Sequence, residues 1–107
     1  MPRLVVIESP LKGTPDEVDR NIAYARRCMK HALDNGEAPF AGHLLYPQVY
    51  NDNDPAQRAA GIAAHIAWID ACEWVVVYVD LGISEGMQKA IDYATKIGKP
   101  IVRRAIM

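Results

Sequence analysis

Long apolar runs are absent from this chain of 107 residues. No stretch approaches the roughly 18 apolar residues of a membrane-spanning helix, and the N-terminus lacks the pattern of a secretory signal. An excess of charge of one sign is also absent, since 12 basic and 13 acidic side chains give a net charge of −1. Without such an excess the chain has no general attraction to nucleic acid or anionic membranes, so neither is an expected partner.

Cysteine is scarce, and Cys28 and Cys72 stand alone in the sequence. Both fall on expected apolar faces, which indicates reduced core thiols in a cytoplasmic protein. No set of histidine, cysteine and acidic residues has metal-site spacing, so we expect no metal and no other cofactor. Repeats and low-complexity segments are missing too, and the length suits a single domain spanning residues 1–107.

The chain does contain short aliphatic runs that alternate with amphipathic segments. Strands are expected at residues 4–7, 38–42, 73–79 and 100–103, and helices at 15–34, 55–71 and 85–97. Thr14, Asp54 and Ser84 stand where helix caps are needed, and prolines follow the first two. The expected inner stripe of the first helix is Val18, Ile22, Ala25, Met29 and Leu33.

This alternation predicts an α/β fold, a three-layer Rossmann- or flavodoxin-like sandwich with a small parallel sheet of four to five strands. Ligands of such sheets bind beyond the carboxyl ends of the strands. Three expected loops meet there, at residues 8–13, 42–48 and 80–87. Candidate binding residues are therefore sought in these loops.

The loop after the central strand is the first candidate. Asp80 ends the strand, Ser84 can cap the next helix, and the N–H groups of Gly86 and Met87 would then point outward. Such a helix start suits an anion, and a glycine lets a ligand approach the main chain closely. An ordinary strand-to-helix connection would show the same local pattern.

The loop after the first strand is the second candidate. Ser9, Pro10, Lys12 and Gly13 precede a helix and suit a phosphate or carboxylate, although their spacing is not that of a P-loop. A solvated turn lysine explains Lys12 equally well. Glu8 is either a carboxylate that faces the pocket or a residue of its rim.

The remaining candidates are histidines and aromatic residues. His43 can act as an acid, a base or a hydrogen-bond donor, and Tyr46 can stack on a planar base. His65, inside an expected helix, is interpreted as structural. Trp68 and Trp74 are expected in the core or in a subunit contact.

Several of these segments together resemble the nucleoside 2-deoxyribosyltransferase-like superfamily, and the resemblance spans nearly the whole chain. They are the loop from Ser9-Pro10 to Gly13, a helix opening near Asn21, the strand with Pro39-Phe40, and the motifs His43-Leu44-Leu45-Tyr46-Pro47-Gln48 and Ile83-Ser84-Glu85-Gly86-Met87. The chain is similar to the short members common in phages and prophages.

The resemblance implies a site for nucleosides or nucleoside 5′-monophosphates. In the superfamily's nucleotide hydrolases, a serine at the helix start holds the 5′-phosphate, and Ser84 and Gly86 match that motif. The enzymes are N-glycosidases or deoxyribosyltransferases whose nucleophile is a glutamate on the same helix. The matching position here is Ala90, which has no group to form a glycosyl intermediate.

Three functions follow as alternatives. The first is a nucleotide- or nucleoside-binding protein that lacks the usual catalytic glutamate. The second is an N-glycosidase or deoxyribosyltransferase in which Glu85 or Glu8 replaces that acid. The third is an oligomeric interaction module with a vestigial pocket. A homo-oligomer, a dimer or larger, is expected in each case because so small a sheet covers its edges poorly.

Overall fold

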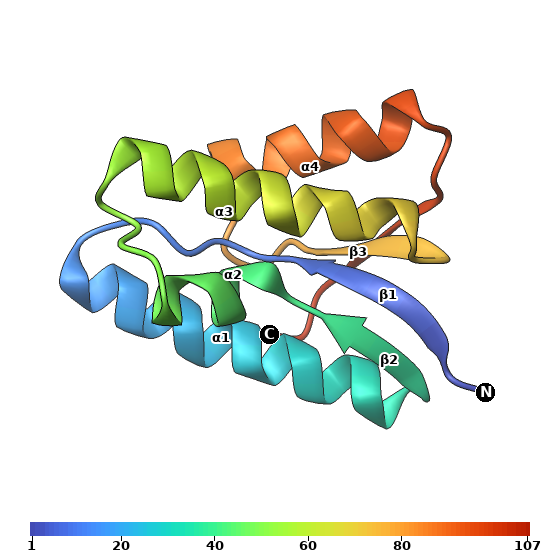
Figure 1. The fold of residues 1–107 in the computed structure, drawn as a ribbon. Helices are drawn as coiled ribbons and strands as arrows, with labels where there is room; N and C mark the ends of the chain where they lie inside the picture. Colours follow the sequence, from blue (N-terminus) through green and yellow to red (C-terminus); the bar gives the residue numbers. More distant parts are fainter.

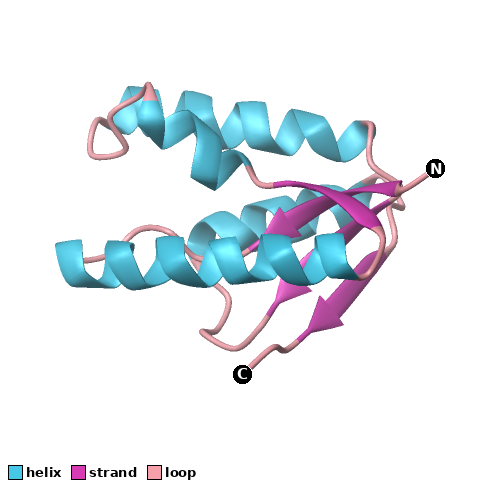
Figure 2. Ribbon diagram, turned by 90° about the horizontal axis from the view of Figure 1, so that it is seen from below, coloured by secondary structure: helices cyan, strands magenta, loops and turns pink.

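The computed structural model describes all 107 residues, which fold around one parallel sheet (Figure 1). The strands lie in the order β2-β1-β3-β4, and every neighbouring pair is parallel (Figure 2). Their bounds are β1 Arg3–Glu8, β2 Glu37–Phe40, β3 Trp74–Tyr78 and β4 Ile101–Arg104. The parallel sheet is confirmed, with four strands.

Helices cover both faces of this sheet. Helix α1 (Pro15–Asp34) packs on one face, while α3 (Pro55–Ala67) and α4 (Glu85–Lys96) pack on the other (Figure 1). The short α2 (Gly42–Leu45) and a 3-10 turn at Tyr46–Gln48 connect β2 to α3. The three-layer α/β sandwich is therefore confirmed, and its strand order is that of flavodoxin-like folds. None of the helices has both the length and the apolar character needed to cross a bilayer.

The core consists of two layers because successive strand residues point to opposite faces. Val5, Ile7, Val76 and Tyr78 pack under α1, together with small residues of that helix. The alternate valines, Val6, Val75 and Val77, pack against α4 and the turn after α3. The continuous valine run of β3 is thus buried on both sides, as a central parallel strand requires.

The helix starts follow the expected caps. Thr14 and Glu17 form a reciprocal capping box at the start of α1. The Asp54 carboxylate accepts the N–H groups of Ala56 and Gln57 at the start of α3. These side chains satisfy amides that a helix start otherwise leaves unpaired, so they fix where each helix begins.

The stripe predicted for α1 is confirmed in part, because Ala25 is buried and Met29 packs against the core, whereas Val18 and Ile22 are only half-buried. Leu33 is 58% exposed. The fully buried residues of the helix are Asn21, Tyr24, Ala25, Cys28 and Ala32, so its buried face is turned from the predicted one while sharing Ala25 with it. Small side chains bring the helix close to the sheet, and the Asn21 amide satisfies the Leu11 carbonyl at 3.0 Å.

Two element boundaries also differ from expectation. Helix α3 ends at Ala67 rather than near residue 71, and a 3-10 turn, Trp68–Asp70, follows it. The tighter turn buries Ile69 completely and leaves Trp68 48% exposed, so Trp68 is not a core residue. Gly42 begins α2 instead of ending the strand.

Candidate functional site

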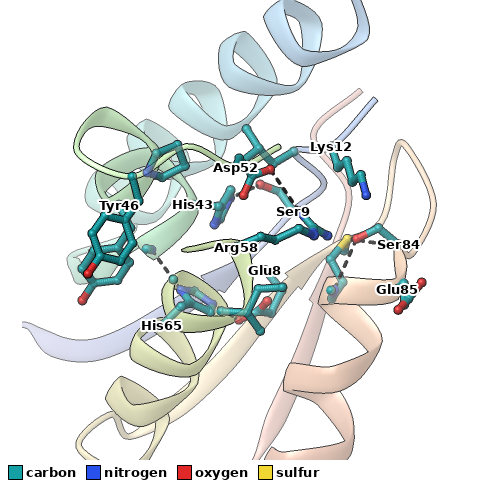
Figure 3. A pocket seen from close by; sticks show the side chains of 18 of the residues that line it. Glu8, Ser9, Lys12, His43, Tyr46, Asp52, Arg58, His65, Ser84 and Glu85 are labelled. Atoms are coloured by element: carbon teal, nitrogen blue, oxygen red, sulfur yellow. Dashed lines mark hydrogen bonds and ion pairs between the residues drawn. The ribbon is translucent and has the colours of Figure 1, made fainter. Parts of the chain in front are cut away.

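A cavity of about 320 Å³ opens at the carboxyl ends of β1 and β3. This is where the strand order changes direction, the usual ligand position in open α/β sheets. The loops after β1 and β3 supply its walls, together with α2, α3 and the segment between them (Figure 3). Nine of the twelve predicted site residues line it: Glu8, Ser9, Lys12, His43, Tyr46, Ser84, Glu85, Gly86 and Met87.

The start of α4 forms one end of the cavity. Ser84 caps the helix, because its Oγ accepts the N–H of Met87 at 3.2 Å. The N–H groups of Glu85 and Gly86 have no backbone or capping partner, so they carry the positive end of the helix. The prediction of a free amide at Met87 is wrong, since the serine cap occupies that amide.

Arg58, which sequence analysis missed, adds a cation at this end. Its Nη1 donates to Asp52 Oδ2 at 3.0 Å. Its Nη2 lies 3.9 Å from where a Cβ on Gly86 would stand, so the guanidinium reaches the start of α4 (Figure 3). Lys12 lines the same cavity and joins none of the chain's ion pairs. Two cations and two free amides make this end suitable for an anion.

Glu8 and His65 form a buried pair farther along the wall. His65 Nε2 lies 2.5 Å from Glu8 Oε2, and the two side chains are only 9% and 4% exposed. The N–H of Gly42 donates to His65 Nδ1 at 2.9 Å. A neutral His65 therefore carries its proton on Nε2 and donates it to Glu8. Burial raises the pKa of Glu8 above its usual value, and the hydrogen bond from His65 opposes that rise in part.

Ser9 and His43 form a second pair beside the first. Ser9 Oγ and His43 Nε2 are 2.6 Å apart, and the rings of His43 and His65 meet edge to face. Burial, assisted by His65, lowers the pKa of His43 to about 3. The His43 ring is therefore neutral at physiological pH and offers a ligand hydrogen bonds without charge. No three His, Cys, Asp or Glu side chains gather as a metal site would require.

Aromatic side chains form the opposite end of the cavity. The Tyr46 hydroxyl accepts a hydrogen bond from Trp68 Nε1 at 2.9 Å. Phe40 supports both rings, with centroids 6.2 Å from Tyr46 and 4.7 Å from Trp68. Tyr50 also lines the cavity and is half-exposed. These flat surfaces are suited to stacking against a planar base.

Three predicted site residues lie outside the cavity: Pro10, Gly13 and Asp80. Asp80 accepts the Tyr24 hydroxyl at 2.6 Å and the N–H groups of Ile106 and Met107. These bonds, that of Tyr24 foremost, hold the Asp80 pKa below its usual value. The carboxylate therefore fastens the C-terminal tail to α1 and does not face a ligand. Pro10 is buried, and Gly13 lines an adjoining groove beside α1 and α2.

The acids considered as replacements for the missing glutamate differ sharply in environment. Ala90 is fully buried, packs in the core and does not line the cavity. Glu85 has a side chain 86% exposed and lies 3.6 Å from Lys89. Glu8, by contrast, is withdrawn from bulk water in the cavity wall.

The cavity-facing side of α3 carries a signal that was available in the sequence. Arg58, Gly61, Ile62 and His65 have the three- and four-residue spacing of one helix face, and all line the cavity. The spacing by itself is equally typical of the core-facing stripe of an ordinary helix. The role of His65 depends on Glu8, which lies 57 residues away in the chain. No local pattern could reveal that pairing.

Comparison with known proteins agrees with this architecture. A family model described as a domain of unknown function (DUF7768) matches residues 3–104. No curated protein matches the chain. Among solved structures, a 2-deoxyribosyltransferase from Bacillus psychrosaccharolyticus superposes with a TM-score of 0.67. The identity is 14%, and the superposition covers 95% of this chain and 72% of the other. At that identity the likeness establishes a shared fold.

Proposed function

Since the chain belongs to the family defined by the domain of unknown function DUF7768, we propose its function from its cavity: it binds a nucleotide or nucleoside. A 5′-phosphate would lie on the free amides of Glu85 and Gly86, beside Arg58 and Lys12. The base would lie at the aromatic end near Tyr46. The sugar would then pass Glu8 and Ser9, which lie between the two ends (Figure 3).

The observation that carries this proposal is the position of the Arg58 guanidinium over the start of α4. A helix start alone attracts anions weakly, whereas a guanidinium adds charge-assisted hydrogen bonds. Nη1 of Arg58 is bonded to Asp52, and Nη2 extends toward Gly86. The cation is therefore positioned before a ligand binds. Such preorganisation lowers the entropic cost of binding.

Two further features support a ligand of nucleotide size and type. A volume of about 320 Å³ falls in the range of pockets that enclose small molecules. The fold is also shared with a 2-deoxyribosyltransferase, an enzyme whose name implies a nucleoside ligand. That second argument is one of analogy, because one fold can host unrelated sites.

Calorimetric titration with nucleoside 5′-monophosphates and the matching nucleosides tests the proposal. The wild-type protein should bind at least one monophosphate more tightly than its nucleoside. Arg58→Ala should weaken monophosphate binding by about 10- to 100-fold, the value of a charge-assisted hydrogen bond, and affect the nucleoside much less. Ser84→Ala and Lys12→Ala should act in the same direction.

Arg27→Ala is the matched control, because Arg27 is an exposed arginine of α1 that does not line the cavity. It should leave both affinities unchanged. If Arg58→Ala, Ser84→Ala and Lys12→Ala all bind every ligand as the wild-type protein does, the phosphate site is not at the start of α4.

A further inference from the structure

A second hollow lies beside the cavity and has no part in the proposed function. It is a groove of about 540 Å³ between α1 and α2, called here the α1–α2 groove. Five residues line both the groove and the cavity: Leu11, Lys12, His43, Pro47 and Asp52. The two hollows therefore adjoin along one boundary. Because Lys12 is exposed, this boundary reaches the protein surface, and a ligand can cross it there.

The lining of the α1–α2 groove contains apolar side chains that the core leaves partly exposed. Val18 and Ile22, two residues of the stripe predicted for α1, line the groove and are only half-buried. Leu11, Leu44 and Pro47 line it as well and are also half-buried. Apolar surface gathered in a concave place gives a ligand something to bury, which is the usual character of a small-molecule site.

The charged groups of the groove are mainly cationic. Lys12 lies at the boundary and Arg26 lies in the α1 wall, and neither joins an ion pair of the chain. Asp52 is the one acid in the lining, and the Arg58 guanidinium compensates its charge at 3.0 Å. The groove therefore presents net positive charge and suits an anionic group near its boundary with the cavity.

We propose that the α1–α2 groove is a second nucleoside subsite, and that the ligand is a dinucleotide whose two nucleosides are joined through a pyrophosphate. This inference rests on the proposed function and extends it. The first nucleoside and its phosphate occupy the cavity as described above. The second phosphate lies at Lys12, and the second nucleoside lies against Val18 and Ile22 beside Arg26.

The distribution of cations supports a linkage through two phosphates. Arg58 lines only the cavity, Arg26 lines only the groove, and Lys12 lines both. Lys12 lies on the same side of the cavity as Ser84, where the first phosphate is proposed (Figure 3). A pyrophosphate places its two charged groups next to each other, so it can span this boundary with a cation at each phosphate.

The position of the groove also fits such a linkage. The residues shared by the two hollows include Pro47, which follows Tyr46 at the aromatic end, so the groove runs alongside the cavity. The second nucleoside must therefore fold back beside the first. The rotatable P–O bonds of a pyrophosphate allow that turn.

Calorimetric titration with symmetric dinucleoside diphosphates of the four bases tests this inference. Each is compared with the matching nucleoside 5′-mono- and diphosphate, so the result does not depend on which base the Tyr46 end selects. At least one dinucleotide should bind about 10-fold or more tightly than its nucleoside diphosphate, because only the dinucleotide buries the groove's apolar surface.

Variants of the groove give the second readout. Arg26→Ala and Ile22→Glu should each weaken dinucleotide binding by about 10-fold and leave monophosphate binding unchanged, which also shows that the variants are folded. Arg27→Ala is the matched control, since Arg27 is the neighbouring exposed arginine of α1 and lines neither hollow. It should bind every ligand as the wild-type protein does.

The outcomes separate this inference from the proposed function. Dinucleotides that bind no more tightly than the matching nucleoside diphosphates overturn the second subsite and leave the binding of monophosphates intact. If Arg26→Ala and Ile22→Glu weaken monophosphates as much as dinucleotides, the groove does not hold a second nucleoside and the inference is wrong. If no mono-, di- or dinucleotide ligand binds at all, the proposed function fails and the inference fails with it.

Discussion

The buried environment of Glu8 favours the protonated form of its carboxyl group over the charged form. Its folded-state pKa lies above the unfolded value of 4.5 because burial penalises the carboxylate. Below pH 4.5 the Glu8 side chain is protonated in both the folded and the unfolded state, so it does not lower the free energy of unfolding. As pH rises through the window between the unfolded and folded pKa values, the folded state loses stability at up to about 1.4 kcal/mol per pH unit.

Glu8→Gln should therefore raise the free energy of unfolding at pH 7 relative to wild type. Glutamine keeps an oxygen that accepts the His65 hydrogen bond and carries no charge to desolvate. The gain should vanish at pH 4, where the wild-type acid is also neutral. Urea denaturation at the two pH values measures it, and a variant less stable than wild type at pH 7 would contradict the assigned environment.

Gly42 is the residue whose small size places His65. A Cβ at this position would stand 2.6 Å from His65 Nδ1. Gly42→Ala should therefore destabilise the fold by about 1–3 kcal/mol, as overpacking does. Gly61→Ala is the matched change on α3, where the nearest atom to a Cβ is 3.7 Å away. It should instead stabilise the helix by about 0.5–1 kcal/mol. Equal effects in denaturant titrations would mean that Gly42 is not under steric constraint.

Sequence position was enough to propose Glu8, Ser9 and Ser84 for the site, because loops at the carboxyl ends of parallel strands converge. It was not enough for Arg58 and His65. The roles of these side chains depend on contacts with residues far away in the chain, such as the bond between His65 and Glu8. The helical spacing shows only that the two residues lie on the same face of α3. Asp80 was predicted as a binding residue because it follows the central strand. Its actual partners, Tyr24 in α1 and Ile106 in the C-terminal tail, are far away in the sequence, so the sequence did not reveal them.

Helix α4 shows at the scale of an element how one segment serves both the core and the site. Its first turn lines the cavity, while Met87, Ala90, Ile91 and Ala94 are buried against the sheet. Position 90 therefore belongs to the core in this chain. A carboxylate introduced there would have to displace packed atoms and lose its hydration.

Ala90→Glu is accordingly expected to destabilise the fold by several kcal/mol, because it adds both volume and an unpaired charge to a fully buried site. Ala90→Ser changes the volume far less and is the milder comparison. Thermal unfolding monitored by circular dichroism measures both. An Ala90→Glu protein as stable as wild type would show that position 90 opens to the cavity.

Most helices and strands could be predicted from the sequence, because the residues that cap a helix or form a buried strand are close together in the chain. Thr14, Asp54 and Ser84 cap helices in the structure as their side chains predict. The buried face of α1 was readable only in part, because the stripe with Ile22 and Leu33 is more apolar than the face with Asn21 that the structure buries. Tertiary contacts selected the buried face, since Asn21 bonds the Leu11 carbonyl and Tyr24 bonds Asp80.

For the whole molecule, the alternation of strands and helices indicated a parallel sheet but not its order. The order β2-β1-β3-β4 puts β1 beside β3, and this adjacency brings Glu8 and Ser84 to one cavity. The proposed binding function depends on that adjacency. It also requires a fixed order of groups along the cavity. The Arg58 cation must lie at the phosphate, the Glu8 carboxyl group at the sugar and the Tyr46 ring at the base.

A crystal structure of the protein with a nucleoside 5′-monophosphate tests this arrangement most directly. We expect the phosphate within hydrogen-bond distance of the Gly86 amide and the Arg58 guanidinium, the base against Tyr46, and the glycosidic bond beside Glu8. A phosphate bound elsewhere, or a nucleotide lying with its base at the start of α4, would contradict the account.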